Sequence, residues 1–220
     1  MNNAVTRALK RVRRAAVDTV VPRAVFMLRG KRVSGRRRAA LTFDDGPHVL
    51  TRAYLDVLGR HHARATFFLI GDHCVRRPDD VRAIADAGHE VGSHGFSHAR
   101  WPRLGRQRLD AELSRTEALL PARAGRPLLR PPNGVIDVGT LVACATSGRT
   151  TVHWSLDTLD YRKTEPAVLA ARMGPGVVED GEVILLHEGK PWTLAALDLA
   201  LPRLRDAGVE LVTVGELLGA

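Results

Sequence analysis

Two adjacent carboxylates, Asp44 and Asp45, follow the apolar run 39–43 and precede a Gly-Pro pair. The apolar run is typical of a buried β-strand, and the Gly-Pro pair indicates a turn. Two carboxylates at the end of a buried strand are costly unless a positive charge lies beside or between them. The sequence therefore predicts a metal ion, an arginine or both close to this pair.

Two histidines could share a metal ion with one of these carboxylates. His94 and His98 are four residues apart, so their side chains point the same way if one helical turn joins them. With one carboxylate they would form a ligand set that leaves metal positions free for water and substrate. The spacing alone does not distinguish this pair from two surface histidines.

Three more polar clusters follow strand-like runs. Arg130 follows one run and can pair with a carboxylate, which would keep that carboxylate ionised. The segment 154–161 follows a second run, and His187 follows a third. One such histidine is often a core residue. Clusters after successive strands indicate one shared site, because α/β folds place their chemistry at the carboxyl ends of strands.

The elements that must position these residues alternate between strand-like and helix-like runs. We expect strands at 39–43, 65–70, 89–92, 128–129, 150–154, 182–186 and 209–214. We expect helices at 52–60, 78–87, 106–120, 137–146, 166–173, 193–206 and 215–218. About seven βα units predict a parallel sheet covered by helices, either open or closed into a barrel.

The five clusters together resemble the ordered motifs of polysaccharide deacetylases of the NodB-homology type, carbohydrate esterase family 4. The motifs correspond here to residues 42–47, 94–98, 130–133, 157–161 and 185–187. The resemblance covers about residues 38–218. It implies an α/β fold, a distorted (β/α) barrel with about seven βα units, and an enzyme that hydrolyses acetyl groups.

The resemblance assigns roles within the first, second and fifth motifs. Asp45, His94 and His98 would bind a divalent metal, most often Zn²⁺, with Co²⁺, Ni²⁺ or Mn²⁺ as alternatives. Asp44 would be the general base and His187 the general acid. The residues by themselves do not say which of the two carboxylates has which task.

Two further residues would support the base and the acid. By the same resemblance, Arg130 would hold Asp44 in its working state and Asp160 would do so for His187. These roles agree with the chemistry of amide hydrolysis, which needs an activated water and a proton for a poor amine leaving group. Histidine is suited to deliver that proton near neutral pH.

The resemblance also implies that four residues contact the substrate. Trp154 and Leu185 would form the apolar pocket for the acetyl methyl group. Asn133 stands where the family has tyrosine, so a backbone N–H for the oxyanion remains but an aromatic groove wall is lost. Tyr161 stands where the family has tryptophan. Both departures put the identity of the substrate in question more than catalysis.

The expected function is a metal-dependent hydrolase that removes acetyl groups from an N-acetylated sugar in an oligosaccharide, polysaccharide or lipid-linked glycan. One alternative is an O-acetyl esterase acting on a polysaccharide such as xylan. A second alternative is a non-catalytic carbohydrate-binding relative. The second is disfavoured because no motif has lost a ligand or a base.

The charge of the chain is concentrated at its amino terminus. Residues 1–38 carry a net charge of +11, whereas residues 39–220 carry −2, which disfavours a nucleic-acid partner. We therefore divide the chain into a basic N-terminal helix or arm, 1–36, and a catalytic domain, 37–220. Residues 4–17 show a helical period with a basic face, so they could contact an anionic membrane, dock on the domain or form a loose arm.

No run approaches the ~20 apolar residues that a membrane span needs. We also see no small-residue cleavage site behind an apolar run, so we expect a cytoplasmic enzyme, peripheral at the inner membrane face if 4–17 bind lipid. Among the remaining residues, Trp101 and Trp192 fit a sugar-stacking platform or core packing equally well. His73 and Glu188 are expected at solvated positions.

Overall fold

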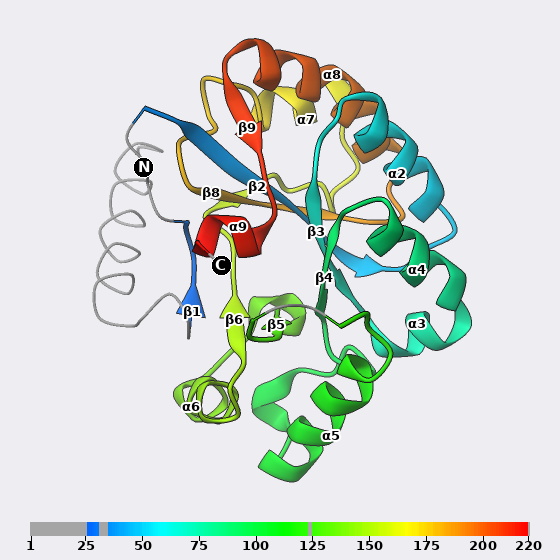
Figure 1. Cartoon of the computed structure of the whole chain (residues 1–220), viewed down its shortest axis with the longest axis vertical. Coiled ribbons are helices and arrows are strands. Elements are labelled where there is room, and N and C mark those ends of the chain that lie inside the picture. Colours follow the sequence, from blue (N-terminus) through cyan, green and yellow to red (C-terminus); the bar gives the residue numbers. More distant parts are fainter. Residues whose placement is uncertain (1–25, 31–34, 123–124, 220) are drawn as a thin grey trace.

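The chain folds around one parallel sheet (Figure 1). The computed structural model describes residues 26–30, 35–122 and 125–219. Within them the sheet has nine strands in the order β1-β6-β5-β4-β3-β2-β8-β7, and β9 pairs with β2. Every pairing between these strands is parallel. The parallel α/β arrangement expected from the sequence is therefore confirmed.

The strands are short except for β2. They are β1 (Phe26–Met27), β2 (Arg37–Gly46), β3 (Ala65–Leu69), β4 (Glu90–Ser93), β5 (Leu128–Leu129), β6 (Thr150–Val152), β7 (Leu156–Asp157), β8 (Glu182–His187) and β9 (Val209–Leu211). The α-helices are α2 (Thr51–Arg60), α3 (Gly71–Arg76), α4 (Pro78–Asp86), α5 (Arg106–Glu117), α6 (Val138–Thr146), α7 (Pro166–Arg172), α8 (Pro191–Asp206) and α9 (Val214–Leu218). Two 3₁₀ turns are η1 (Trp101–Arg103) and η2 (Pro132–Gly134).

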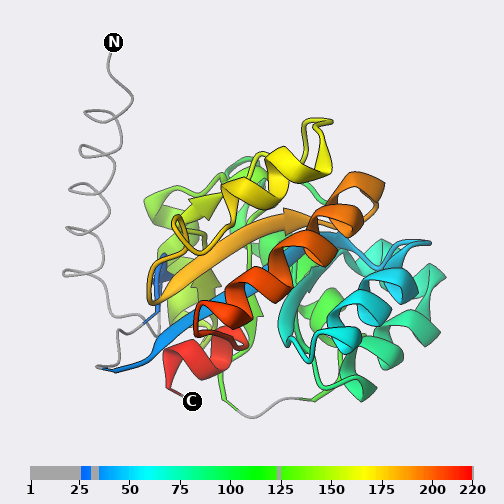
Figure 2. The ribbon, with the colours of Figure 1, turned by 90° about the horizontal axis from the view of Figure 1, so that it is seen from above.

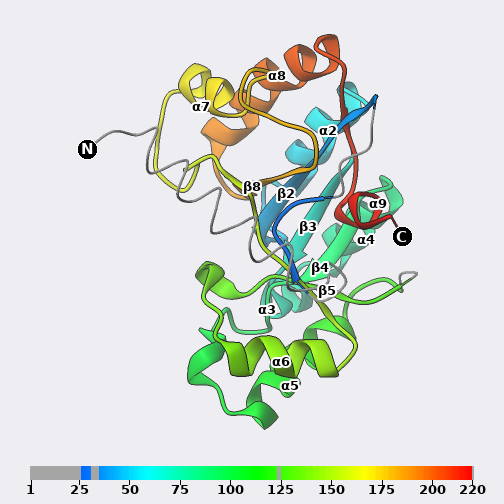
Figure 3. The same ribbon diagram turned by 90° about the vertical axis from the view of Figure 1, so that its left-hand side faces the viewer.

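The sheet curves into an open barrel with helices on its outer side (Figures 1 and 3). α7 and α8 pack against each other beside β8 (Figure 2). Among the described residues no pairing joins β7 to β1, so the sheet is not closed into a full barrel. This is the distorted barrel that the sequence led us to expect.

Two of the three hydrophobic clusters in the described part of the chain lie on the two faces of the sheet. On β2, Leu41 and Phe43 pack in the outer core beneath the helices, whereas Ala40 packs in the inner core. Because side chains alternate along a strand, Asp44 shares the inner face with Ala40. The helix α9 closes the amino-terminal end of the interior, where the backbone N–H of Val214 donates to Thr66 Oγ1 at the start of β3. The opposite end of the interior, at the carboxyl ends of the strands, is not covered by α9, and the polar residues of the five motifs lie there.

Several elements differ from the sequence expectation. The run 209–214 was expected to be a strand throughout, but the strand ends at Leu211 and Val214 already belongs to α9. The reason is a capping box in which Thr213 and Glu216 start that helix. The short elements β1, β7 and α3 were not predicted.

The strand β1 lies before the boundary that we placed at residue 36, and it pairs with β6. The expected basic helix at 4–17 lies outside the described residues. None of the helices in the described part of the chain is long and apolar enough to cross a membrane.

Candidate active site

The carboxyl ends of the strands bring the five motifs to one place. Asp44 and Asp45 end β2, His94 follows β4, Arg130 follows β5 and His187 ends β8. Neighbouring parallel strands end at the same edge of a sheet, so residues far apart in the sequence become neighbours. The distances below show which of these residues the structure brings together.

Asp45, His94 and His98 form a cluster of potential metal ligands. One donor atom from each lies within 4.8 Å of the others. Oδ1 of Asp45 is 3.4 Å from Nε2 of His98 and 3.7 Å from Nε2 of His94. His94 is buried, whereas about a third of the His98 and Asp45 side-chain surface is exposed (35% and 36%). The cluster therefore has one side open to solvent.

The tautomer of His94 suits metal binding. Its Nδ1 lies 2.8 Å from the backbone carbonyl oxygen of Arg130. A carbonyl only accepts hydrogen bonds, so we assign the proton to Nδ1, which leaves the lone pair of Nε2 facing Asp45. Burial lowers the pKa of His94, although the charges of Asp44 and Asp45 oppose this effect. Two imidazoles and one carboxylate are a donor set that fits Zn²⁺ or a similar divalent cation.

An irregularity in β2 allows both carboxylates to reach the site. The register between β2 and β3 shifts between Phe43 and Gly46, and Asp45 has φ of 70°. Adjacent residues of a regular strand would point to opposite faces. A bulge of this kind re-aims one side chain, and here it leaves Asp44 on the inner face while Asp45 turns toward the histidines.

Arg130 lies in the interior and fixes Asp44. Its Nη1 donates to Asp44 Oδ1 (2.8 Å) and to Thr42 Oγ1 (2.7 Å). Its Nε and Nη2 donate to the backbone carbonyl groups of Val152 (3.2 Å) and His153 (3.0 Å). Every nitrogen of the buried guanidinium group thus has an acceptor, as a buried charge requires.

The environment of Asp44 favours its charged form. Burial alone would raise the pKa of Asp44. The positive charge of Arg130, then the charges of His94 and His187 and finally the Arg130 hydrogen bond, together outweigh burial and lower this pKa. Asp44 is therefore held as a buried carboxylate, which is the state a general base needs.

His187 and Asp160 form a second charged pair. Nδ1 of His187 is 2.7 Å from Asp160 Oδ1, and the backbone N–H of His187 donates to Asp160 Oδ2 (2.8 Å). Thr193 Oγ1 also donates to Oδ2 of this fully buried carboxylate (3.0 Å). Burial alone would lower the pKa of His187, but the hydrogen bond and charge of Asp160, with the charges of Asp44 and Asp45, raise it. A raised pKa suits a histidine that must donate a proton at neutral pH.

The predicted substrate-binding residues lie at the same edge of the sheet. Leu185 is two positions before His187 on β8, so the two share a face. The ring centroid of Tyr161, which is 45% exposed, lies 5.8 Å from that of His187 in an edge-on arrangement. The side chain of Trp154 packs against Gly134, where an added Cβ would clash with Trp154 Cη2. These positions agree with contact to substrate, while the roles themselves stay predictions.

Asn133 adopts a left-handed backbone conformation, with φ of 57°. This conformation is unfavourable for most side chains, but asparagine tolerates it better than most. The position that we compared with the family's tyrosine is therefore part of a sharp turn in η2. Its side chain is exposed beside the site.

The expectation that Glu188 is solvated is wrong, because this residue is only 2% exposed. Its Oε2 accepts hydrogen bonds from Thr51 Oγ1 (2.6 Å) and from the backbone N–H of His48 (3.0 Å). An added Cβ at Gly46 would lie 2.6 Å from Glu188 Oε1, so the turn packs directly on the carboxyl group. Burial raises the pKa of Glu188 to about 7. Glu188 therefore stabilises the turn that follows Asp45. In the sequence, the only sign of its burial was its position directly after a buried strand.

Three other residues are also better defined by the structure. His73 is half-buried rather than solvated, and its Nδ1 lies 2.9 Å from the backbone oxygen of Asp45. Trp101 is fully buried, so it belongs to the core and is no sugar platform. Trp192 donates from Nε1 to the backbone oxygen of Asp160 (2.7 Å), so it helps to fix the residue that binds His187.

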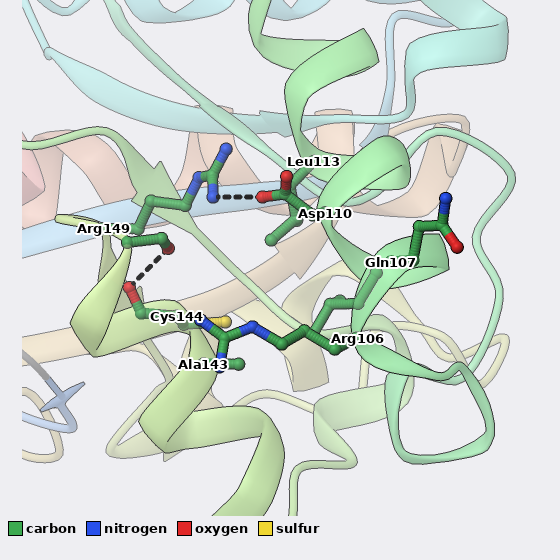
Figure 4. A pocket seen from close by; sticks show the side chains of 9 residues that line it. Arg106, Gln107, Asp110, Leu113, Ala143, Cys144 and Arg149 are labelled. Atoms are coloured by element: carbon green, nitrogen blue, oxygen red, sulfur yellow. Dashed lines mark hydrogen bonds and ion pairs between the residues drawn. The ribbon is translucent and has the colours of Figure 1, made fainter.

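A separate cavity of about 530 Å³ lies between α5 and α6 (Figure 4). Its walls include Leu109, Leu113, Cys144 and Arg149. Arg149 forms an ion pair with Asp110 at this cavity (3.0 Å). None of the residues lining the cavity belongs to the five motifs, so it is distinct from the candidate active site.

Comparisons with known proteins identify a matching family and several relatives. The sequence profile of the family described as polysaccharide deacetylase matches residues 31–152, which contain the first three motifs. A chitooligosaccharide deacetylase of Sinorhizobium fredii is 34% identical over 193 residues, covering 80% of this chain and 89% of that protein. The peptidoglycan-N-acetylglucosamine deacetylase PgdA of Listeria monocytogenes is 32% identical over 186 residues, or 83% of this chain. The match spans only 39% of the length of the Listeria protein.

A solved structure has the same fold. The crystal structure of the Bc1960 peptidoglycan N-acetylglucosamine deacetylase superposes with a TM-score of 0.83 at 29% identity. The superposition covers 89% of this chain and 94% of that one. The similarity in fold therefore extends over most of the chain.

Proposed function

The chain belongs to the polysaccharide deacetylase family, and from this we propose that it is a metal-dependent hydrolase that removes the acetyl group from an N-acetylated sugar. The observation that carries the proposal is the division between the two carboxylates of the first motif. Asp44 is buried and bound to Arg130, and its Oδ2 is also 3.8 Å from His94 Nε2. Asp45 is partly exposed, and its Oδ1 lies near both His94 and His98. A hydrolase that activates water on a metal needs one group that binds the metal and another that accepts a proton from the water.

The proposed substrate is an acetylated amino sugar within a glycan. Two relatives are named for peptidoglycan N-acetylglucosamine and for chitooligosaccharide, which share the acetamido group on a sugar ring. The exposed ring of Tyr161 beside His187 supports contact with a sugar, because aromatic rings offer an apolar face together with a polar edge.

Asp45, His94 and His98 would hold the metal. A divalent cation bound there would lower the pKa of water and stabilise negative charge on the carbonyl oxygen. The donor set fits Zn²⁺, with Co²⁺, Ni²⁺ and Mn²⁺ as alternatives that a metal analysis distinguishes. The open side of the cluster leaves room for the acetamido group.

Asp44 and His187 would move the protons. Asp44 would accept a proton from the attacking water on Oδ2, because Oδ1 is already bound to Arg130. His187 would then donate from Nε2 to the leaving amine, because its Nδ1 is bound to Asp160. An amine leaves poorly without a proton, so the raised pKa of His187 favours an amide substrate over an ester.

A substrate screen tests this proposal. Acetate release would be measured with N-acetylated chito-oligosaccharides, peptidoglycan and acetylated xylan, each with and without a chelator. We expect release from an N-acetylated glycan that stops after chelation and returns when Zn²⁺ or Co²⁺ is added. Release from xylan alone would support the O-acetyl esterase instead. No release from any acetylated glycan by the metal-loaded protein would contradict the proposal.

A further inference from the structure

The two metal-binding histidines are joined by a loop rather than by the helical turn that their spacing suggested. No helix is assigned to residues 94–98. Gly95 has φ of 82° and His98 has φ of 59°, so the backbone turns sharply on both sides of Phe96 and Ser97. A loop of this kind has no ladder of its own hydrogen bonds, so the position of His98 depends on what holds the loop from outside.

Glu112 of α5 binds this loop through three hydrogen bonds. Its Oε2 accepts from the backbone N–H groups of Phe96 and Ser97, both at 2.8 Å. Its Oε1 accepts from Ser97 Oγ, also at 2.8 Å. Consecutive backbone N–H groups form a concave site for an anion, and bonds to a charged acceptor are stronger than those to a neutral one.

The opposite side of the loop is fixed to α3. The backbone N–H groups of Gly71 and Asp72 donate to the carbonyl oxygens of Gly95 (3.0 Å) and Phe96 (2.9 Å). The N–H groups of the loop thus face Glu112 while its carbonyl groups face α3. The loop is held from two elements, and Glu112 supplies the charged contact.

Close packing leaves the loop little freedom to adjust. An added Cβ at Gly95 would lie 3.1 Å from Trp101 Nε1 and 3.5 Å from Glu112 Oε2. The backbone at Gly95 therefore lies close to both a buried ring and the carboxylate. If the carboxylate were removed, the two N–H groups would lose their acceptor and the loop would have space to move.

We propose that Glu112 is a positioning residue that fixes His98 relative to His94 and thereby sets the affinity of the site for its metal. The inference rests on the proposed metal site, and it adds a residue outside the five motifs. Partners that orient metal ligands in this way change metal affinity by about 10–100-fold when they are mutated. Glu112 acts through the backbone of the loop and does not touch the metal or the substrate.

The test compares metal affinities of the apo full-length protein by titration with Co²⁺ and Zn²⁺ against a competing chelator. We expect Glu112→Ala to weaken binding by about 10–100-fold and to alter the visible spectrum of the Co²⁺ complex. Glu112→Gln keeps one carbonyl acceptor, so its affinity should fall between those of Glu112→Ala and the wild type. Glu117→Ala is the matched control, because Glu117 is on the same helix but binds Arg149.

The outcomes separate this inference from the proposed function. Wild-type protein that binds neither metal would contradict the metal site itself. Wild-type affinity and an unchanged spectrum in every folded Glu112 variant would overturn only the positioning role. If Glu112→Ala does not fold, the test rests on Glu112→Gln: weaker metal binding supports the positioning role, and wild-type affinity with an unchanged spectrum overturns it. A loss of affinity in Glu117→Ala equal to that in Glu112→Ala would also overturn the inference, because it would reflect damage to α5 in general.

Discussion

Nη1 of Arg130 lies 2.8 Å from Oδ1 of Asp44, and both side chains are buried in the interior of the open barrel. Asp45, the next residue, is one-third exposed, and its Oδ1 lies near both His94 and His98. His94 Nε2 is also 3.8 Å from Asp44 Oδ2, so the two carboxylates share this histidine but differ in burial and in their other partner. This difference is the physical basis for giving one of them a proton-transfer role and the other a metal.

Arg130→Lys tests the contact that keeps Asp44 ionised. Lysine retains the charge but cannot donate to Asp44, Val152 and His153 in the geometry of the guanidinium group. We expect the free energy of unfolding to fall by about 1–3 kcal/mol for a backbone acceptor left unpaired. The pKa of Asp44 should rise, so the acid limb of the kcat/KM profile should move to higher pH.

A second buried arginine provides the control for this substitution. Arg149 binds two carboxylates, Glu117 and Asp110, but it lies beside the cavity between α5 and α6. Arg149→Lys should reduce stability without moving the pH profile. An unmoved acid limb in Arg130→Lys, measured under the same conditions, would show that Arg130 does not control the ionisation of Asp44.

Asp160→Asn tests the partner of His187. Asp160 raises the pKa of His187, and a general acid acts only while it is protonated. Activity should therefore decline as pH rises through the pKa of His187, and this alkaline limb should move to lower pH in Asp160→Asn. At pH 8 we expect kcat to fall by as much as about 10⁴-fold, the upper range for a lost acid–base group.

The neighbouring Asp157 allows a matched control. Asp157 is exposed, and its Oδ1 accepts only a local hydrogen bond from the backbone N–H of Leu159 among the contacts described (2.9 Å). Asp157→Asn should leave the alkaline limb in place. If Asp160→Asn does so as well, the proton donor is a group other than His187.

Glu188→Gln tests how a buried carboxyl group affects stability. The pKa of Glu188 is raised from 4.5 to about 7, so the folded protein binds this proton more tightly than the unfolded chain does. The stabilisation is complete below pH 4.5 and is lost as pH rises through about 7. The free energy of unfolding of the wild type should therefore decline across this range, and Glu188→Gln should remove that part of the decline.

Urea unfolding at several pH values between 5 and 8 measures this effect. The control is Glu210→Gln, because Glu210 is an exposed residue of β9. Its substitution should leave the pH dependence unchanged. An equally steep decline in Glu188→Gln and in the wild type would mean that Glu188 is ionised throughout this range.

The sequence was informative where polar residues of the candidate site directly follow a strand. The run before Asp44 predicted β2, and the need to neutralise two carboxylates predicted both Arg130 and the histidines. The roles within this set came from family resemblance, because adjacent carboxylates have the same chemistry in the sequence. Their different directions depend on the bulge in β2, which is set by pairing with β3 and leaves no pattern in the residues.

The supporting residues could not be predicted in the same way. Glu112 and Glu188 are charged residues, which are normally solvated. Their burial or bonding depends on the backbone N–H groups of distant loops, namely Phe96 and Ser97 for Glu112 and His48 for Glu188. Such contacts form only after the fold has brought the elements together.

The most direct test of the central claim compares Asp44→Asn with Asp45→Asn. For each purified protein, bound zinc per chain and acetate release from an N-acetylated glycan would be measured together. We expect Asp44→Asn to keep its zinc while acetate release falls by about 10²–10⁴-fold, and Asp45→Asn to lose zinc and activity together. Wild-type acetate release by Asp44→Asn, or loss of zinc from Asp44→Asn but not from Asp45→Asn, would contradict the division of tasks between the two carboxylates.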